Sequence, residues 1–194
     1  FLKACGDPAS VASFDPEAAS PEGYLFPETY LLPKGTPAET LVASMTARFR
    51  EVFGETGFRK AAALRMSVRS VVTLASLIEK ETSLAEEKPL VAAVFHNRLR
   101  IGMKLDCDPT VIYALKRDGL YRGRILLKDL KYESPYNTYV APGLPPGPIC
   151  NPGRDSLLAA LNPAPGDYLY FVADNKGGHR FSRTYGEHLK AVRR

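Results

Sequence analysis

The sequence lacks any long hydrophobic run. No stretch of about 18 apolar residues occurs, so these residues are not expected to span a membrane. The chain begins at Phe1, and its first residues show no secretory pattern of positive charge, apolar core and cleavage site. Residues 1–21 are rich in Ala, Ser, Pro and Asp. We therefore expect them to form an irregular lead-in, the remnant of a longer N-terminal region.

Cysteine is scarce. The chain has 3 cysteines, Cys5, Cys107 and Cys150, and no two of them form a Cys-x-x-Cys pair. A cysteine-based zinc site therefore has little support. An oxidising compartment would permit a disulfide, for which Cys107 and Cys150 are the candidates because both lie in motif-bearing loops. The alternative is that they remain small, buried, unreactive thiols.

Repeats and low-complexity tracts are also missing. The net charge of +5 is modest, and no basic run alternates with aromatic residues. A basic surface favours anionic polymers, including cell-wall polymers and nucleic acid, but this pattern does not indicate a nucleic-acid reader. With 194 residues, 45% hydrophobic and 24% charged, the chain has the composition of one substantial globular domain with its own core.

Hydrophobic periodicity predicts several helices and one hairpin. The helices are expected at 37–53 (closed by Gly54), 67–82, 83–101 (or from a later start at Pro89), 109–118, 156–161 and 185–192. Residues 168–173 and 179–182 flank a Gly-rich turn, which predicts an antiparallel β-hairpin. Helices clustered centrally beside a small antiparallel sheet imply an α+β fold, with a helix-rich body.

The helix expected at 67–82 places carboxylates within its apolar stripe. Glu79 projects between Val68 and Val72, and Glu81 lies on the opposite flank. A carboxylate held against aliphatic groups tends to stay protonated towards neutral pH, as a general acid must. The alternative is that such a Glu is a solvated or ion-paired residue near a helix end, without a catalytic role. The spacing does not decide whether Glu79 or Glu81 is the better candidate for catalysis.

Several motifs follow one another around this helix. They are Ser76–Thr82, Val91–Leu99, Gly102–Leu105, Asp108–Ala114, Ser134–Tyr139 and Gly143–Ile149. In order and spacing this series resembles the endolytic murein transglycosylases of the YceG-like (MltG) family, and the likeness extends from Glu22 to Phe181. The resemblance implies that residues 22–194 form a YceG-like catalytic domain.

That resemblance implies a bacterial enzyme, a lytic transglycosylase. Such enzymes cleave the bond between N-acetylmuramic acid (MurNAc) and N-acetylglucosamine (GlcNAc) in peptidoglycan, leave 1,6-anhydroMurNAc ends, and help to terminate strand elongation. In the family the first Glu of the matching segment is catalytic, which implies Glu79 here. The resemblance also implies an N-terminal membrane anchor, an extracytoplasmic catalytic domain facing the cell wall, and glycan polymerases as partners.

A loop after residue 133 supplies the candidate substrate-binding side chains. They are Tyr136, Asn137, Thr138 and Tyr139, followed by Leu144 and Pro145 from a segment dense in Pro and Gly. Tyr rings stack on sugar faces, and Asn137 offers hydrogen bonds to an N-acetyl group or to Glu79. Alternatively, Asn137 braces the loop by bonding its backbone, and the second segment simply turns the chain.

Other site chemistries have less support. Asp106 and Asp108 suggest metal binding by their spacing, with His96 nearby in sequence, but Asp108 stands before a proline as a helix cap would. We expect no metal and no cofactor. His179 and His188 lie in no triad-like motif with Ser or Cys.

Two alternative functions remain open. One is a non-catalytic glycan-binding or scaffold module. The other is a pyridoxal-phosphate-dependent aminodeoxychorismate lyase, a label that proteins of this family have carried. Such a lyase needs a Schiff-base Lys and a phosphate cradle, and the sequence contains no convincing Gly-rich phosphate loop.

Overall fold

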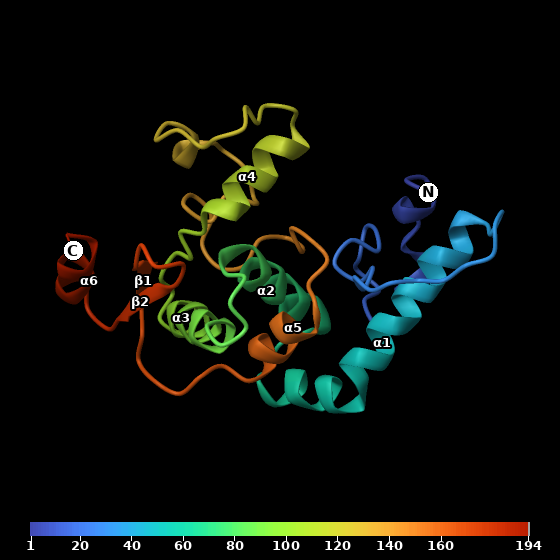
Figure 1. Cartoon of the computed structure of the whole chain (residues 1–194), viewed down its shortest axis with the longest axis horizontal. Coiled ribbons are helices and arrows are strands. Elements are labelled where there is room, and N and C mark those ends of the chain that lie inside the picture. Colours follow the sequence, from blue (N-terminus) through green and yellow to red (C-terminus); the bar gives the residue numbers. More distant parts are fainter. Residues whose placement is uncertain (194) are drawn as a thin grey trace.

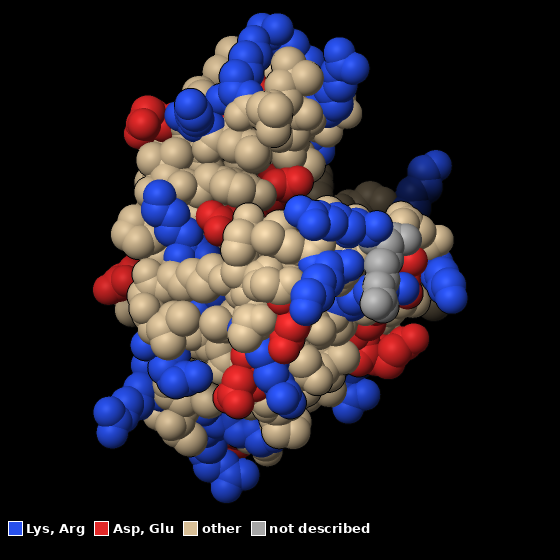
Figure 2. Space-filling model, turned by 90° about the vertical axis from the view of Figure 1, so that its left-hand side faces the viewer, with Lys and Arg blue, Asp and Glu red and all other residues tan. Residues whose placement is uncertain are grey.

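The computed structural model describes residues 1–193 and places helix α2, Val68–Glu81, at the centre of a helical body (Figure 1). It packs against α1 (Ala38–Ala63), α3 (Lys88–Arg100), α4 (Asp108–Arg117) and α5 (Arg154–Leu161). The helix begins after Ser67, whose Oγ accepts a hydrogen bond from Ser70 N at 3.0 Å. Helix α4 and the residues after it form a lobe that projects from the body (Figures 1 and 2).

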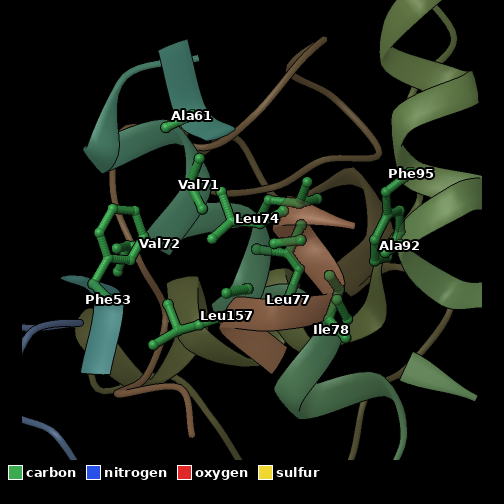
Figure 3. Close-up of a cluster of buried hydrophobic side chains, with 14 of the residues drawn as sticks. Phe53, Ala61, Val71, Val72, Leu74, Leu77, Ile78, Ala92, Phe95 and Leu157 are labelled. Carbon is green, nitrogen blue, oxygen red and sulfur yellow. The ribbon is translucent and has the colours of Figure 1, made fainter. Parts of the chain in front are cut away.

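The buried faces of these helices form one apolar core. Figure 3 shows Val71, Val72, Leu74, Leu77 and Ile78 from α2, Phe53 and Ala61 from α1, Ala92 and Phe95 from α3, and Leu157 from α5. Burying a side chain of this size contributes about 1.5–3 kcal/mol relative to leaving it in water. Every residue of α2 from Val71 to Ile78 is buried, which explains why its sequence is apolar on more than one face.

A two-stranded antiparallel sheet follows the helices. β1 (Tyr170–Ala173) pairs with β2 (His179–Ser182), with Phe171 opposite Phe181, and α6 (Tyr185–Val192) packs on both strands. Short 3-10 turns occur at Ala4–Gly6, Pro8–Ser10 and Asp129–Lys131. The predicted α+β class and the predicted hairpin are confirmed.

Several helix boundaries differ in detail from those predicted; α5, for example, starts at Arg154 rather than at residue 156. Helix α1 continues to Ala63, although Gly54 (φ 57°, ψ 176°) interrupts it where the sequence predicts an end. Helix α3 starts at Lys88, the later of the two expected starts, because a proline in the first turn needs no N–H partner. Asp108 is the first residue of α4 rather than its cap, and Cys107 occupies the cap position.

The structure of residues 1–193 bears on two predictions, one about membrane-spanning segments and one about a disulfide. No single helix there is long and apolar enough to cross a membrane, and α1 and α2 meet that criterion only as a pair bent by 100°. Cys107 and Cys150 are free, so the chain has the thiols of the alternative prediction rather than the disulfide. Cys107 is buried, whereas Cys150 is half-buried.

The lead-in is anchored to the body. Val11 is fully buried in the same core as α2. The Asp15 carboxylate accepts hydrogen bonds from the Tyr24 hydroxyl and, at 3.1 Å, from Arg69 of α2. Gly23 N donates to Asn151 Oδ1 at 2.7 Å. Residues 1–21 are thus irregular but form part of the packed structure.

Replacing Gly23 by Ala should destabilise the domain. Gly23 has a φ of +91°, and an added Cβ would lie 2.7 Å from Pro148 Cβ and closer still to Pro148 Cγ. Backbone strain at about 1 kcal/mol and overpacking at about 1–3 kcal/mol predict a total loss of about 2–4 kcal/mol in urea unfolding. Gly35→Ala is the control, because Gly35 has a φ of +84° but open space around it. Equal losses for both variants would contradict the predicted clash with Pro148.

Candidate active site

A cleft of about 410 Å³ opens between the start of α4 on one side and the hairpin with α6 on the other. Glu81, the last residue of α2, lines this cleft. Other lining residues are Arg98, Leu105, Asp106, Asp108, Tyr139, Tyr170, Phe171, His179, Tyr185 and His188. The cleft therefore combines three carboxyl groups, those of Glu81, Asp106 and Asp108, with several aromatic rings, the composition of a site for a sugar or another ring-bearing ligand.

The surroundings of Glu81 favour its protonated form. Burial raises the pKa of Glu81 above its ordinary value of 4.5, and the negative charge of Asp108 acts in the same direction. A hydrogen bond with Cys107 and the positive charges of His179 and Arg98 oppose this rise without cancelling it. Burial also keeps the pKa of Cys107 well above 9.0, so this neighbour stays a neutral thiol. Glu81 is thus suited to donate a proton.

Glu79 has the opposite environment. Its Oε2 accepts hydrogen bonds from Lys88 Nζ at 3.0 Å, Ser156 Oγ at 2.5 Å and Gly153 N at 3.3 Å. Burial alone would raise the pKa of Glu79, but these bonds and the Lys88 charge outweigh burial and lower it. Gly153 caps α5, and a helix N-terminus further favours a negative charge. The expectation that apolar neighbours keep Glu79 protonated is therefore wrong, and Glu79 does not line the cleft.

A second carboxylate, Glu87, fixes the orientation of His179 in the cleft. Its Oε2 accepts a hydrogen bond from His179 Nδ1 at 2.6 Å, and its Oε1 accepts one from His179 N at 2.6 Å. Burial would raise the pKa of Glu87, but these bonds and one from Thr82 lower it. Because a carboxylate only accepts, Nδ1 carries the proton and Nε2 remains for a ligand. Sequence reasoning missed this pair because 92 residues separate its members.

Only one of the predicted binding residues lines the cleft. Tyr139 does so, and its hydroxyl donates to Asp108 Oδ1 at 2.6 Å. Asn137 is completely buried, donates to Leu130 O and Tyr132 O, and accepts from Tyr139 N. Asn137 therefore stabilises its own loop through these hydrogen bonds, which is the alternative prediction.

The other predicted binding side chains lie outside this cleft. The buried Thr138 Oγ1 accepts a hydrogen bond from Cys107 N at 3.0 Å. The Tyr136 ring packs on Tyr113, with 4.8 Å between ring centroids. Leu144 lines a different pocket, and Pro145 is buried. None of these four side chains contributes to the lining of the cleft.

Asp106 and Asp108, the candidate metal ligands, both interact with other side chains of the protein. Asp106 Oδ2 lies 3.7 Å from Arg98 Nη1, and Asp108 Oδ1 accepts the hydrogen bond from the Tyr139 hydroxyl. His96 Nε2 is 2.8 Å from Ala160 O and therefore makes a contact within the helical body. Within residues 1–193, no three His, Cys, Asp or Glu side chains are grouped to hold a metal ion.

Comparison with known proteins identifies the family. The family model described as "YceG-like family" matches residues 4–194. The chain belongs to the YceG-like family. Two proteins named endolytic murein transglycosylase are similar to this YceG-like chain: one from Bacillus subtilis, 44% identical over 172 residues, and one from Streptococcus pneumoniae, 36% identical over 174 residues. Each match covers 88% of this chain, but only 46% and 31% of those relatives, so the chain spans less than half of their length.

A solved structure is also similar. A crystal structure of a yceG-like protein from Listeria monocytogenes matches this YceG-like chain with a TM-score of 0.81 and 39% sequence identity. The match covers 97% of this chain and 65% of that one.

The motifs that suggested the family largely converge on the cleft. Glu81 comes from the first motif and Arg98 from the second, while Leu105, Asp108 and Tyr139 come from the next three. The last motif, Gly143–Ile149, contributes no residue to the cleft lining and instead contacts α2 at Ser76, whose Oγ accepts a hydrogen bond from Ile149 N at 3.0 Å. Five of the six motifs of this YceG-like chain thus contribute one residue each to the cleft lining.

Proposed function

We propose that this chain is the catalytic domain of a lytic murein transglycosylase that cleaves the MurNAc–GlcNAc bond of peptidoglycan, with Glu81 as its catalytic acid and base. The observation that carries the proposal is the raised pKa of Glu81 within a cleft that also presents Tyr139, Tyr170 and Tyr185. The names of the Bacillus and Streptococcus relatives support the same reaction class. The choice of Glu81 replaces the assignment to Glu79 that the resemblance implied.

The reaction needs only one carboxyl group. Protonated Glu81 donates its proton to the glycosidic oxygen between MurNAc and GlcNAc, and the bond to C1 of MurNAc breaks. The Glu81 carboxylate then accepts the proton of the MurNAc C6 hydroxyl as that oxygen attacks C1 and closes the 1,6-anhydro ring. No second carboxylate has to activate water, as it must in ordinary glycosidases. The intramolecular nucleophile also has a high effective concentration.

The remaining cleft residues have supporting roles in this proposal. The tyrosine rings provide flat apolar faces for sugar rings. His179, held by Glu87, presents Nε2 to the same space as a hydrogen-bonding group for hydroxyl or N-acetyl groups. Arg98 is fixed by the carbonyls of Leu169 and Leu105, at 2.7 and 2.8 Å, and supplies positive charge. Such charge favours the ionised form of Glu81 that follows the first proton transfer.

No specific observation favours either of the alternative functions. A pyridoxal-phosphate lyase needs a lysine that reaches the cofactor, whereas no lysine lines the cleft in residues 1–193, and Lys88 is paired with Glu79. A non-catalytic glycan-binding module would use the same aromatic cleft, but it would not require a carboxyl group with a raised pKa. The proposed enzyme accounts for both features.

We further propose that the whole protein is a bacterial membrane protein with this domain on the extracytoplasmic side. An N-terminal anchor and glycan polymerases as partners are part of this proposal, because a transglycosylase that terminates strand elongation acts where strands are made. The names of the relatives support peptidoglycan as the substrate.

Muropeptide analysis tests the proposed reaction. Intact peptidoglycan sacculi incubated with the purified domain should release fragments with 1,6-anhydroMurNAc ends, which mass spectrometry distinguishes from reducing ends by the loss of one water. The Glu81→Gln variant serves as the blank. Reducing ends would show hydrolysis instead. Binding of sacculi without any release would favour the scaffold alternative.

A further inference from the structure

Most of the net positive charge of the chain is concentrated in one short segment. Residues 116–131 contain six basic and two acidic residues, a net charge of +4 against +5 for the whole chain. All six basic side chains are exposed: Lys116, Arg117, Arg122, Arg124, Lys128 and Lys131. We call this segment the basic lobe. It forms the top of the projection in Figure 1, and Figure 2 shows Lys and Arg side chains gathered at the same height.

The basic lobe also exposes apolar side chains. Leu127 is 87% exposed, and Leu120 and Leu126 are 47% and 37% exposed. A pocket of about 310 Å³ lies among them, lined by Arg122, Arg124 and Lys128 together with Leu115, Leu120, Leu126, Asp129 and Tyr132. Cations and exposed leucines on one projecting surface are the combination that interfacial membrane-binding segments use.

The two acidic residues of the lobe are used within it. Asp118 Oδ2 accepts a hydrogen bond from the Tyr132 hydroxyl at 2.5 Å, and Asp129 Oδ2 accepts one from Leu126 N at 2.8 Å. No salt bridge within residues 1–193 involves Arg122, Arg124 or Lys128. The acids therefore shape the lobe, while the three cations around the pocket remain available to an anion.

We propose that the basic lobe docks on an anionic phospholipid surface, with lipid phosphates at Arg122, Arg124 and Lys128 and with Leu127 inserted among the lipids. The charges match an anionic leaflet. The leucines favour a bilayer over a soluble anionic polymer, because only the bilayer offers them an apolar environment. This inference does not depend on the proposed catalytic reaction.

Docking would also place the cleft relative to the bilayer. Helix α4 carries the basic lobe at its C-terminal end, and its first residue, Asp108, lines the cleft. Ten helical residues span about 15 Å. The cleft would therefore lie about 15 Å, the length of α4, from the docked lobe. This placement does not depend on a membrane anchor elsewhere in the protein.

Vesicle co-sedimentation tests the charge requirement. The domain should bind vesicles that contain phosphatidylglycerol and phosphatidylcholine, but not vesicles of phosphatidylcholine alone, and added salt should weaken binding. The triple variant Arg122→Gln, Arg124→Gln, Lys128→Gln should bind about 10²-fold more weakly, since each cation near the surface contributes about fivefold. The control triple Lys34→Gln, Arg50→Gln, Arg59→Gln removes the same charge from exposed positions outside the lobe and should bind nearly as well as the parent.

A charge-neutral variant tests the apolar contribution. Leu127→Ser should weaken vesicle binding about tenfold without changing the net charge. Equal losses for the two triple variants would overturn the proposal, because binding would then follow net charge alone. An unchanged affinity of Leu127→Ser, together with equal binding to soluble polyphosphate, would overturn it in favour of a polymer site. All substituted side chains are exposed, and thermal melting checks that each variant is folded.

Discussion

Replacing Glu81 by Gln should reduce the release of 1,6-anhydromuropeptides by about 10²–10⁴-fold, the usual contribution of general acid–base catalysis. Gln keeps the size and hydrogen-bonding capacity of the side chain, but it neither donates the proton to the glycosidic oxygen nor accepts the proton of the C6 hydroxyl. Product release from intact sacculi, measured by chromatography and mass spectrometry, gives the rate. Binding of the variant to sacculi should persist, because the aromatic side chains of the cleft are unchanged.

Glu79→Gln is the matched comparison, because it makes the same chemical change two residues earlier in the same helix. This variant should keep most of its activity when folded. The two variants should also differ in the pH dependence of their melting temperatures. The raised pKa of Glu81 means that its ionisation destabilises the fold as pH rises through that pKa, so Glu81→Gln should melt at the same temperature as the parent at acidic pH and higher at neutral pH.

The lowered pKa of Glu79 predicts the opposite sign. Its ionised form stabilises the fold above the ordinary pKa of 4.5, and this stabilisation is lost as pH falls through the lower folded-state value. Glu79→Gln should therefore melt below the parent at neutral pH, with a difference that narrows in acid. If the folded Glu79→Gln variant is inactive while Glu81→Gln cleaves normally, Glu79 is the catalytic residue after all.

Replacing Lys88 by Met should lower the free energy of unfolding by about 2 kcal/mol and the melting temperature by about 4–8 °C. Lys88 is 10% exposed at its side chain and pairs with Glu79 at 3.0 Å, where α2, α3 and α5 meet. Removing one partner of a fully buried pair costs about 3–5 kcal/mol. The expected loss is smaller here because Glu79 is 31% exposed and keeps its bonds from Ser156 and Gly153.

Lys80→Met is the control for this substitution. Lys80 is exposed on α2 and makes no salt bridge within residues 1–193, so its replacement should change stability by less than about 0.5 kcal/mol. The double variant Glu79→Gln, Lys88→Met should lose less stability than the sum of the single losses, since both remove the same pair. Strictly additive losses would show that the pair contributes no coupling energy.

Local sequence determined most of the secondary structure of this domain. Ser67 before an apolar repeat, Pro89 in a first turn, and the Gly-rich turn between two β-prone segments each act on nearby backbone, so α2, α3 and the hairpin could be predicted without knowledge of the fold. The order and spacing of the motifs also indicated the family. The sequence did not predict that α1 continues after the interruption at Gly54. The residues after Gly54 are held in the helix by packing against the core as well as by their hydrophobic periodicity.

Only the tertiary structure decided how the two carboxylates of α2 differ. Helical spacing gives Glu79 and Glu81 similar positions relative to the apolar stripe, but their pKa values depend on groups from distant segments. The N-terminus of α5 and Lys88 of α3 surround Glu79, whereas Cys107, Asp108 and the hairpin surround Glu81. Electrostatic free energies depend on distance in space and on burial, so no local pattern records them.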